Sequence, residues 1–154
     1  MTIAALVPGS DSLELEHLLL DVNGTLTSDG ELLDGVAGAL ASLADVLSVR
    51  LLSADTFGTA RAAAERLGRA IEIVANGDDK RALVERLGPA RCAAVGNGRN
   101  DAPMLRAAAL GIAVIGAEGA SGHTLAAADV VCTSVLEALA LLSHPTRLTA
   151  TLRP

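Results

Sequence analysis

Three polar stretches of the sequence carry residue types that phosphate chemistry uses. Asp21 follows three leucines and precedes Asn23 by two positions, in LLLDVNGTLTSDG. Ser53 ends the run SVRLLS, and GNGRND covers residues 96–101. A carboxylate can approach a phosphate only if a cation offsets the repulsion between the two negative charges. A lysine, Lys80, stands in the stretch GDDKRALVERLG, where a helix is expected to begin.

Each of these residues also has an ordinary structural explanation. The Asn-Gly pair after Asp21 is typical of a tight turn, so Asp21 could be a turn residue. A serine that ends a strand, like Ser53, is usually a cap or a turn. Lys80 could be a solvated surface lysine, although a lysine in the first turn of a helix opposes the helix dipole. Only the combination of these residues favours a phosphate site.

The elements that would position these residues can be read from the apolar pattern. The runs HLLLD, SVRLLSA, IEIVA, RCAAVG, LGIAVIG and DVVCT alternate with helical patterns. They are apolar throughout, as strands are when helices cover both faces of a parallel sheet. We therefore expect a three-layer αβα, doubly wound parallel sheet. Ligands bind such sheets beyond the carboxyl ends of the strands, where Asp21, Ser53 and GNGRND would meet.

Helices and a hairpin are predicted around these strands. Apolar stripes with helical spacing cover residues 36–47, 60–67, 83–87 and 135–142. Gly68 and Gly88 follow two of the stripes, at positions where glycine commonly ends a helix. Before the first strand, IAALV and LELEH are joined by PGSDS and predict an N-terminal β-hairpin, with leucines alternating with Glu14 and Glu16.

The composition favours one domain and excludes several functions. A chain of 154 residues fits a single domain, with a hairpin at 1–17, a core at 18–143 and a C-terminal tail at 144–154. The net charge of −6 and the aromatic content of 1% make nucleic acid and anionic membranes poor partners. The start MTIAALVPGSDS is not a signal peptide, and no apolar run is long enough to span a membrane, so we expect a cytoplasmic protein. Cys92 and Cys132 lie in apolar runs and are predicted to be buried, reduced thiols.

The strand-end motifs together resemble the haloacid dehalogenase superfamily of phosphohydrolases. The first family motif reads Asp-x-x-Gly-Thr-Leu-Thr, and residues 21–27 match it. The later motif reads Gly-Asp-Gly-x-Asn-Asp-Ala-Pro, and residues 96–103 match it except at Asn97. The stretches LSADTFGTA, LGIAVIGAEGA and RLTATLR are similar to a group of soluble, P-type-ATPase-like members. The resemblance covers nearly all the chain and implies the Rossmann-like core of this superfamily.

The resemblance implies a Mg²⁺-dependent phosphohydrolase or phosphotransferase. Asp21 would attack phosphorus and become an aspartyl phosphate, while Lys80 neutralises charge and Ser53 binds phosphoryl oxygens. Mg²⁺ prefers oxygen ligands, which carboxylates and amides supply. The implied sets are catalytic residues Asp21, Asn23 and Lys80; phosphate-binding residues Asn23, Ser53, Ala54, Lys80 and Asn100; and metal ligands Asp21, Asn23, Asn97 and Asp101.

Two amides stand where many family members have acids. Asn23 occupies the place of an aspartate that protonates the leaving group and then activates water, and an amide can do neither. General acid–base catalysis typically contributes about 10²–10⁴-fold, so we expect slow turnover with poor leaving groups. Asn97 removes a second negative charge from the metal site. Restoring both acids, with Asn23→Asp and Asn97→Asp, is expected to raise turnover and would test this interpretation.

The spacing of the motifs leaves no room for a cap domain. About 27 residues separate Leu26 from Ser53, and about 25 separate Ala54 from Lys80, too few for a domain insertion. The site should therefore be open to a phosphorylated small molecule or a phosphoprotein, or be closed by a second copy in a homo-oligomer. The flap TSDGEL and the tail HPTRLTATLRP are candidates for such contacts, the tail as a strand because Leu148 and Leu152 alternate with polar residues.

Two further interpretations compete with the enzyme. The absent acids favour a non-catalytic module that binds phosphate or Mg²⁺, forms oligomers and regulates a partner. A nucleotide-binding Rossmann domain is suggested by Gly96-x-Gly98 after a strand. However, Asp101 holds the place of the third glycine, and a carboxylate there would repel a pyrophosphate.

Overall fold

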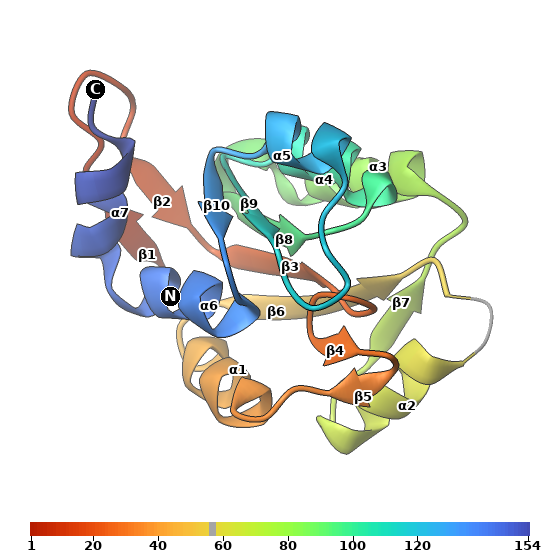
Figure 1. Cartoon of the computed structure of the whole chain (residues 1–154). Coiled ribbons are helices and arrows are strands. Elements are labelled where there is room, and N and C mark those ends of the chain that lie inside the picture. Colours follow the sequence, from red (N-terminus) through yellow and green to blue (C-terminus); the bar gives the residue numbers. More distant parts are fainter. Residues whose placement is uncertain (56–57) are drawn as a thin grey trace.

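A six-stranded parallel sheet forms the centre of the computed structural model, which describes residues 1–55 and 58–154. The strand order is β10-β9-β8-β3-β6-β7, with every neighbouring pair parallel (Figure 1). The strands are β3 (His17–Asp21), β6 (Ser48–Ser53), β7 (Ile71–Ile73), β8 (Cys92–Gly96), β9 (Leu110–Val114) and β10 (Val130–Cys132). This confirms the predicted doubly wound sheet. Thr56 and Phe57, within the stretch LSADTFGTA, lie outside the described residues.

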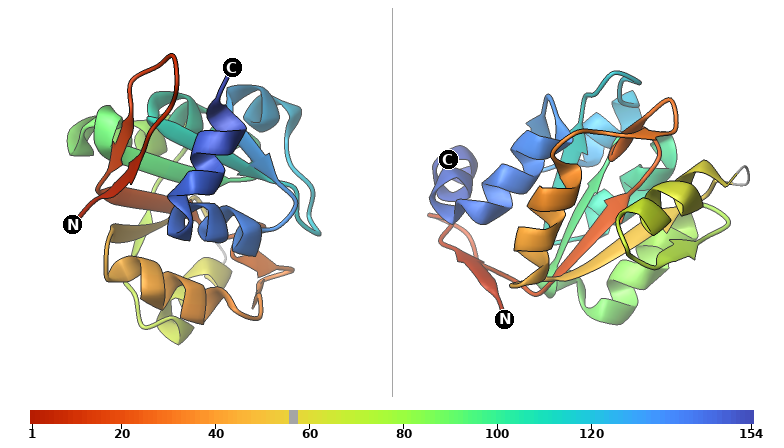
Figure 2. Two further views of the ribbon diagram at one scale, coloured as in Figure 1. Left: turned by 90° about the vertical axis from the view of Figure 1, so that its left-hand side faces the viewer. Right: turned by 90° about the horizontal axis from the view of Figure 1, so that it is seen from below.

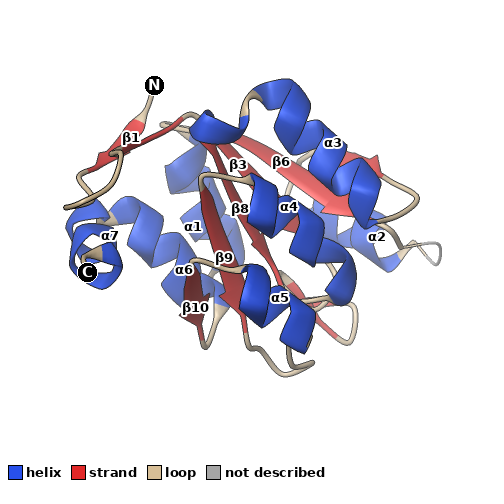
Figure 3. Cartoon of the chain, turned by 90° about the horizontal axis from the view of Figure 1, so that it is seen from above, coloured by secondary structure: helices blue, strands red, loops and turns tan. Residues whose placement is uncertain are grey.

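Helices cover both faces of the sheet (Figure 3). One face carries α1 (Val36–Ala44), α2 (Thr59–Arg66) and α6 (Val135–Ser143), and the other carries α3 (Gly77–Leu87), α4 (Ala102–Ala107) and α5 (Gly122–Ala127). Short 3₁₀ turns, η1 (Pro89–Arg91) and η2 (Arg99–Asp101), flank β8. Between β3 and α1, β4 (Thr27–Ser28) and β5 (Glu31–Leu32) form an antiparallel flap, as the sequence predicts for TSDGEL.

The leucines before Asp21 show why the strands are apolar throughout. Leu18 and Leu20 pack into the core beneath α1 and α6, whereas Leu19 points to the other face and packs with the α3 and α4 residues. All three are fully buried. Successive side chains of a strand point to opposite faces, so a strand covered on both sides needs an apolar residue at every position.

Helix ends follow the predicted glycines. Gly68 comes directly after the C-cap of α2 with φ +66, and Gly88 is the C-cap of α3 with φ +98. Positive φ costs a glycine little, because it has no Cβ. At the start of α3, the Asn76 side chain accepts a hydrogen bond from the Asp79 N–H. The Asn76 cap marks where α3 begins and therefore where its first turn places Lys80.

The predicted hairpin is present, but the predicted tail strand is wrong. β1 (Ile3–Ala5) and β2 (Leu13–Leu15) pair antiparallel, with Leu13 and Leu15 buried and Glu14 exposed. The tail instead forms helix α7 (Pro145–Leu152), which packs beside the hairpin (Figure 2). Leu148 is buried and Leu152 is half-buried. A spacing of four puts both on one face of a helix as well as of a strand, and Pro145 suits the first helical turn.

Cys92 and Cys132 are buried free thiols, as predicted. Burial raises the pKa of both thiols, that of Cys92 to about 11. Within the described part of the chain, no helix is long and apolar enough to cross a membrane.

Candidate active site

Asp21 is the last residue of β3 and is held at the carboxyl edge of the sheet. Its side chain is almost completely buried, and the residue is 6% exposed. The chain then curls back, so that the N–H groups of Thr25 and Leu26 donate to the Val22 carbonyl oxygen. Gly24 has φ +79 in this loop, and a Cβ there would meet the Asn97 side chain. The Asn-Gly pair therefore turns a loop that presents Asp21, and the flap strands follow only after it.

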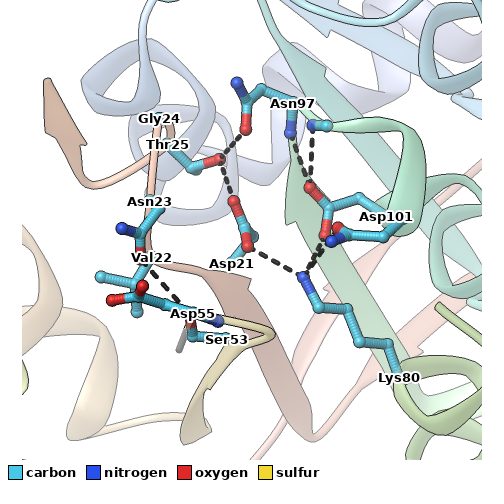
Figure 4. Close-up of polar contacts among 12 residues, drawn as sticks. Asp21, Val22, Asn23, Gly24, Thr25, Ser53, Asp55, Lys80, Asn97 and Asp101 are labelled. Carbon is cyan, nitrogen blue, oxygen red and sulfur yellow. Dashed lines mark hydrogen bonds and ion pairs between the residues drawn. The ribbon is translucent and has the colours of Figure 1, made fainter. Parts of the chain in front are cut away.

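Lys80 is brought to Asp21 from the first turn of α3. Its side chain is fully buried, and its Nζ lies 2.9 Å from Asp21 Oδ1 and 2.7 Å from Asp101 Oδ1 (Figure 4). Nζ also donates to Asn100 Oδ1 at 3.1 Å. Three acceptors thus match the three donors of the ammonium group. The interpretation of Lys80 as a solvated surface lysine is wrong.

The charges of this cluster shift the pKa values of its members. Burial, followed by the negative charge of Asp101, raises the pKa of Asp21 to about 7, although Lys80 and Thr25 partly oppose the shift. Burial by itself would lower the pKa of Lys80, but the two carboxylates outweigh burial and raise it. When both carboxylates are ionised they share one ammonium group, and the cluster then carries an excess negative charge that a further cation would stabilise.

Asp101 acts as the anchor of the loop after β8. Its Oδ2 accepts hydrogen bonds from the N–H groups of Asn97 and Gly98, each at 3.0 Å. Its Oδ1 holds Lys80, so both oxygens have protein partners. Gly96 is required here, because a Cβ on it would overlap the Asp101 carboxyl group. Gly98 has no such constraint, since the nearest atoms to its Cβ would be 3.7 Å away.

Asn97 connects three loops around Asp21. Its Oδ1 accepts a hydrogen bond from the Thr25 hydroxyl at 3.2 Å, and its Nδ2 donates to the Gly119 carbonyl oxygen at 3.1 Å. The same Thr25 hydroxyl lies 3.1 Å from Asp21 Oδ2. The Thr25 hydroxyl therefore lies between the amide oxygen of Asn97 and the carboxylate of Asp21. The side-chain nitrogen of Asn97 is bonded to the backbone.

Asn23 points away from Lys80, toward the end of β6. Its Oδ1 accepts from the Ser53 hydroxyl at 3.3 Å, and its Nδ2 donates to the Thr59 hydroxyl at 2.8 Å. Thr59 in turn donates to Asp55 Oδ2 at 2.9 Å. Sequence reasoning assigned no role to Thr25, Asp55 or Thr59. Asp55 could have been noticed, because it follows Ser53 by two residues at the same strand end.

The predicted residues come together around one cavity of about 310 Å³. Lys80 and Asp101 lie beneath it, fully buried. The structure therefore brings every predicted site residue to one place, although it does not assign their roles. The lining residues are Asp21, Asn23, Ser53, Ala54, Asp55, Asn97, Gly98 and Asn100.

The donor set around the cavity suits a hard cation but carries little charge. Among the described residues, no group of three or more His, Cys, Asp or Glu side chains could hold a metal ion. Asp101 is fully buried and both its oxygens have protein partners, so the carboxylates that line the cavity are those of Asp21 and Asp55. The amides of Asn23, Asn97 and Asn100 line it as well. Carboxylate and amide oxygens are ligands of Mg²⁺, which often uses one or two carboxylates and keeps several waters. The residues present therefore fit such a cation.

The fold and site define an α/β protein with a buried Asp–Lys–Asp cluster beneath an open polar cavity. A sequence model of haloacid dehalogenase-like hydrolases matches residues 3–109. The chain belongs to this family of hydrolases.

Individual relatives extend the comparison. A 3-deoxy-D-manno-octulosonate 8-phosphate phosphatase from Moraxella catarrhalis is 21% identical, with 88% of this chain and 90% of that chain covered and a TM-score of 0.66. A zinc-transporting P-type ATPase is 32% identical over 78% of this chain, with a TM-score of 0.61, but the match spans only 20% of the ATPase. An uncharacterized protein of Methanocaldococcus jannaschii is 48% identical over 60 residues, which are 39% of this chain and 64% of that protein.

Proposed function

We propose that this chain is a phosphohydrolase or phosphotransferase that forms an aspartyl phosphate on Asp21. The observation that carries the proposal is the contact of Lys80 Nζ with both Asp21 and Asp101 directly beneath the cavity. A buried lysine shared by two carboxylates is costly to desolvate unless the charges are tightly paired. Such a cluster, located where a family of hydrolases has its reacting groups, favours catalysis over a purely structural role.

The cavity residues divide the chemical work. An Asp21 oxygen forms a bond to phosphorus, and the bond between phosphorus and the leaving-group oxygen breaks, leaving its electron pair on that oxygen. Lys80 offsets the charge beside Asp21, while the Ser53 hydroxyl and the Asn100 amide line the cavity where phosphoryl oxygens would lie. Asn23 supplies no proton to the leaving group. The preferred substrates are therefore acyl and aryl phosphates, whose leaving groups need none.

A divalent cation, which we propose is Mg²⁺, would complete the site. Asp21, Asn23, Asn97 and Asp101 are the proposed ligands, and the neutral amides predict weak binding. When bound, the metal would offset the negative charge of the phosphoryl group. Two relatives support a divalent metal. The Moraxella catarrhalis phosphatase is described with magnesium and phosphate ions, and a deoxy-D-mannose-octulosonate 8-phosphate phosphatase from Haemophilus influenzae is described in a cobalt-bound form.

Because the cavity is open, it favours a substrate that the protein does not enclose. We propose a phosphorylated small molecule, the class on which the named phosphatases act, with a phosphoprotein as the alternative that an open site would also admit. A homo-oligomer and a cytoplasmic location are part of the same proposal.

Incubation with acetyl phosphate and Mg²⁺ tests the proposal. Intact-mass and peptide mass spectrometry should find one phosphoryl group on Asp21, and beryllium fluoride should raise the melting temperature. Asp21→Asn should abolish both responses. Asp45→Asn is the matched control, because Asp45 is an exposed carboxylate at the C-cap of α1 and should leave both responses unchanged. Absence of labelling on Asp21 in the unmodified protein would count against the enzyme.

A second candidate function is the non-catalytic module that binds phosphate or Mg²⁺. It is favoured by the amides Asn23 and Asn97, both of which are satisfied by hydrogen bonds within the protein. This function predicts that phosphate analogues raise the melting temperature while acetyl phosphate leaves Asp21 unmodified.

A further inference from the structure

Asp55 lies in the same cavity as Asp21 although the family motifs give it no assigned role here. It follows Ser53 by two residues at the end of β6, and its backbone N–H donates to the Ser53 hydroxyl at 2.9 Å. Figure 4 shows its side chain beside Asn23, on the side of the cavity away from Lys80. A carboxylate thus stands next to the amide that replaces the usual acid.

Hydrogen bonds hold Asp55 in place and link it to Asn23. Its Oδ2 accepts from the Thr59 hydroxyl at 2.9 Å and from the Ala60 N–H at 3.0 Å, at the start of α2. The Thr59 hydroxyl also accepts from Asn23 Nδ2 at 2.8 Å. An ionised carboxylate can only accept hydrogen bonds, and the Thr59 hydroxyl and the Ala60 N–H both donate to it. The carboxylate is therefore separated from the Asn23 amide by a single hydroxyl group.

We propose that Asp55 is the general base that activates water to hydrolyse the aspartyl phosphate. This inference rests on the proposed function. A water oxygen forms a bond to phosphorus, and the bond from phosphorus to Asp21 breaks, returning its electron pair to the Asp21 carboxylate. One proton of the water passes to Asp55, and inorganic phosphate leaves. Asp55 then releases the proton to solvent.

This assignment separates the two half-reactions. The carboxylate form of Asp55 can accept a proton but cannot donate one, so it assists hydrolysis and not departure of the first leaving group. It also restores one negative charge to a cavity that lacks the acids at Asn23 and Asn97. The protein would consequently be slow to phosphorylate with poor leaving groups but would release phosphate once phosphorylated.

The substitution Asp55→Asn tests the base directly. An asparagine keeps an oxygen that can accept from Thr59 and Ala60, so the start of α2 is retained. After labelling with acetyl phosphate and Mg²⁺, the phosphoenzyme should form at the rate of the unmodified protein but decay about 10²–10⁴-fold more slowly. If Asp55 only capped α2, its substitution would not slow the decay of the phosphoenzyme while leaving the rate of its formation unchanged. Asp45→Asn again serves as the control.

A second-site substitution makes the test specific. Adding Asn23→Asp to Asp55→Asn should restore decay by at least about 10-fold, because a carboxylate is returned to the other side of Thr59. Asn23→Asp alone should change the rate of decay by less than about 10-fold if Asp55 already supplies the base. This measurement can be made even if Asp55→Asn does not fold. A larger acceleration, or normal decay in Asp55→Asn, would overturn the assignment while leaving the phosphoenzyme intact. Failure to label the unmodified protein would overturn both proposals.

Discussion

The side-chain nitrogen of Asn97 donates a hydrogen bond to the carbonyl oxygen of Gly119, over 3.1 Å. A carboxylate at this position has no donor for that oxygen and would face it with a negative charge. The amide at Asn97 therefore gives the loop that follows β9 a hydrogen bond that a carboxylate could not give, in addition to any effect on a metal. In this respect Asn97 differs from Asn23, the other position at which the family's acid is missing.

Asn97→Asp should lower the free energy of unfolding by about 1–3 kcal/mol, the usual cost of leaving a buried polar group unsatisfied. Urea denaturation of the metal-free protein measures the change. Asn76→Asp is the matched control, because Asn76 is exposed and its side-chain oxygen only accepts, from the Asp79 N–H. If both variants are as stable as the unmodified protein, the Gly119 contact has no structural importance.

Lys80→Met should destabilise the fold and abolish labelling by acetyl phosphate. Removing one member of a buried ion pair typically costs about 3–5 kcal/mol, because the remaining charge is left unpaired. Arg81→Met, in the next residue of α3, is the control: its ion pair with Glu85 is exposed, with side chains 56% and 52% accessible. That variant should lose no more than about 1 kcal/mol. Equal losses in the two variants would show that Lys80 is not a buried charge.

Gly96→Ala and Gly98→Ala should behave very differently. A Cβ at Gly96 would overlap the Asp101 carboxyl group, whereas a Cβ at Gly98 would meet its nearest neighbours at 3.7 Å. Overpacking of this kind typically costs about 1–3 kcal/mol, and here it would also displace the partner of Lys80. Gly96→Ala should therefore have a lower melting temperature and less acetyl phosphate labelling than Gly98→Ala. Similar behaviour of the two alanine variants would contradict the close approach of Gly96 to Asp101.

Asp21 should make the metal-free protein less stable as the pH rises from about 4 to about 7. Burial raises the pKa of its carboxyl from 3.8 to about 7 in the folded protein, so folding favours the protonated form. Its contribution to stability is therefore fully present below the unfolded pKa and is lost as the pH rises through the folded pKa. The slope is at most about 1.4 kcal/mol per pH unit.

Comparison with Asp21→Asn isolates this effect, since the variant cannot titrate at this position. Unfolding free energies measured by urea denaturation in the presence of a chelator, at several pH values, should fall more steeply for the unmodified protein. Parallel curves would mean that the Asp21 carboxyl keeps an ordinary pKa despite its burial.

Much of the fold could be predicted because local patterns and tertiary packing agree. The leucines before Asp21 are apolar at every position, which only a strand covered on both faces requires, and the structure covers both faces there. The tail could not be predicted in this way. Leu148 and Leu152 are four residues apart, which fits one face of a strand or of a helix, and packing against β1 accompanies the helix.

The sequence by itself determined which side chains would meet at one edge. Asp21, Ser53 and the loop after β8 end neighbouring parallel strands, and the carboxyl ends of such strands must lie together. Chain connectivity and strand direction are sufficient for that conclusion.

Only the tertiary structure decided how these side chains are partnered. Thr59 reaches Asn23 from a position 36 residues later, and Gly119 reaches Asn97 across 22 residues. A hydrogen bond depends on the distance and the angle between two groups. The number of residues between them in the sequence gives neither. The apolar pattern therefore predicted the edge of the sheet, whereas the packing of α2 and of the loop after β9 determined which atoms contact one another there.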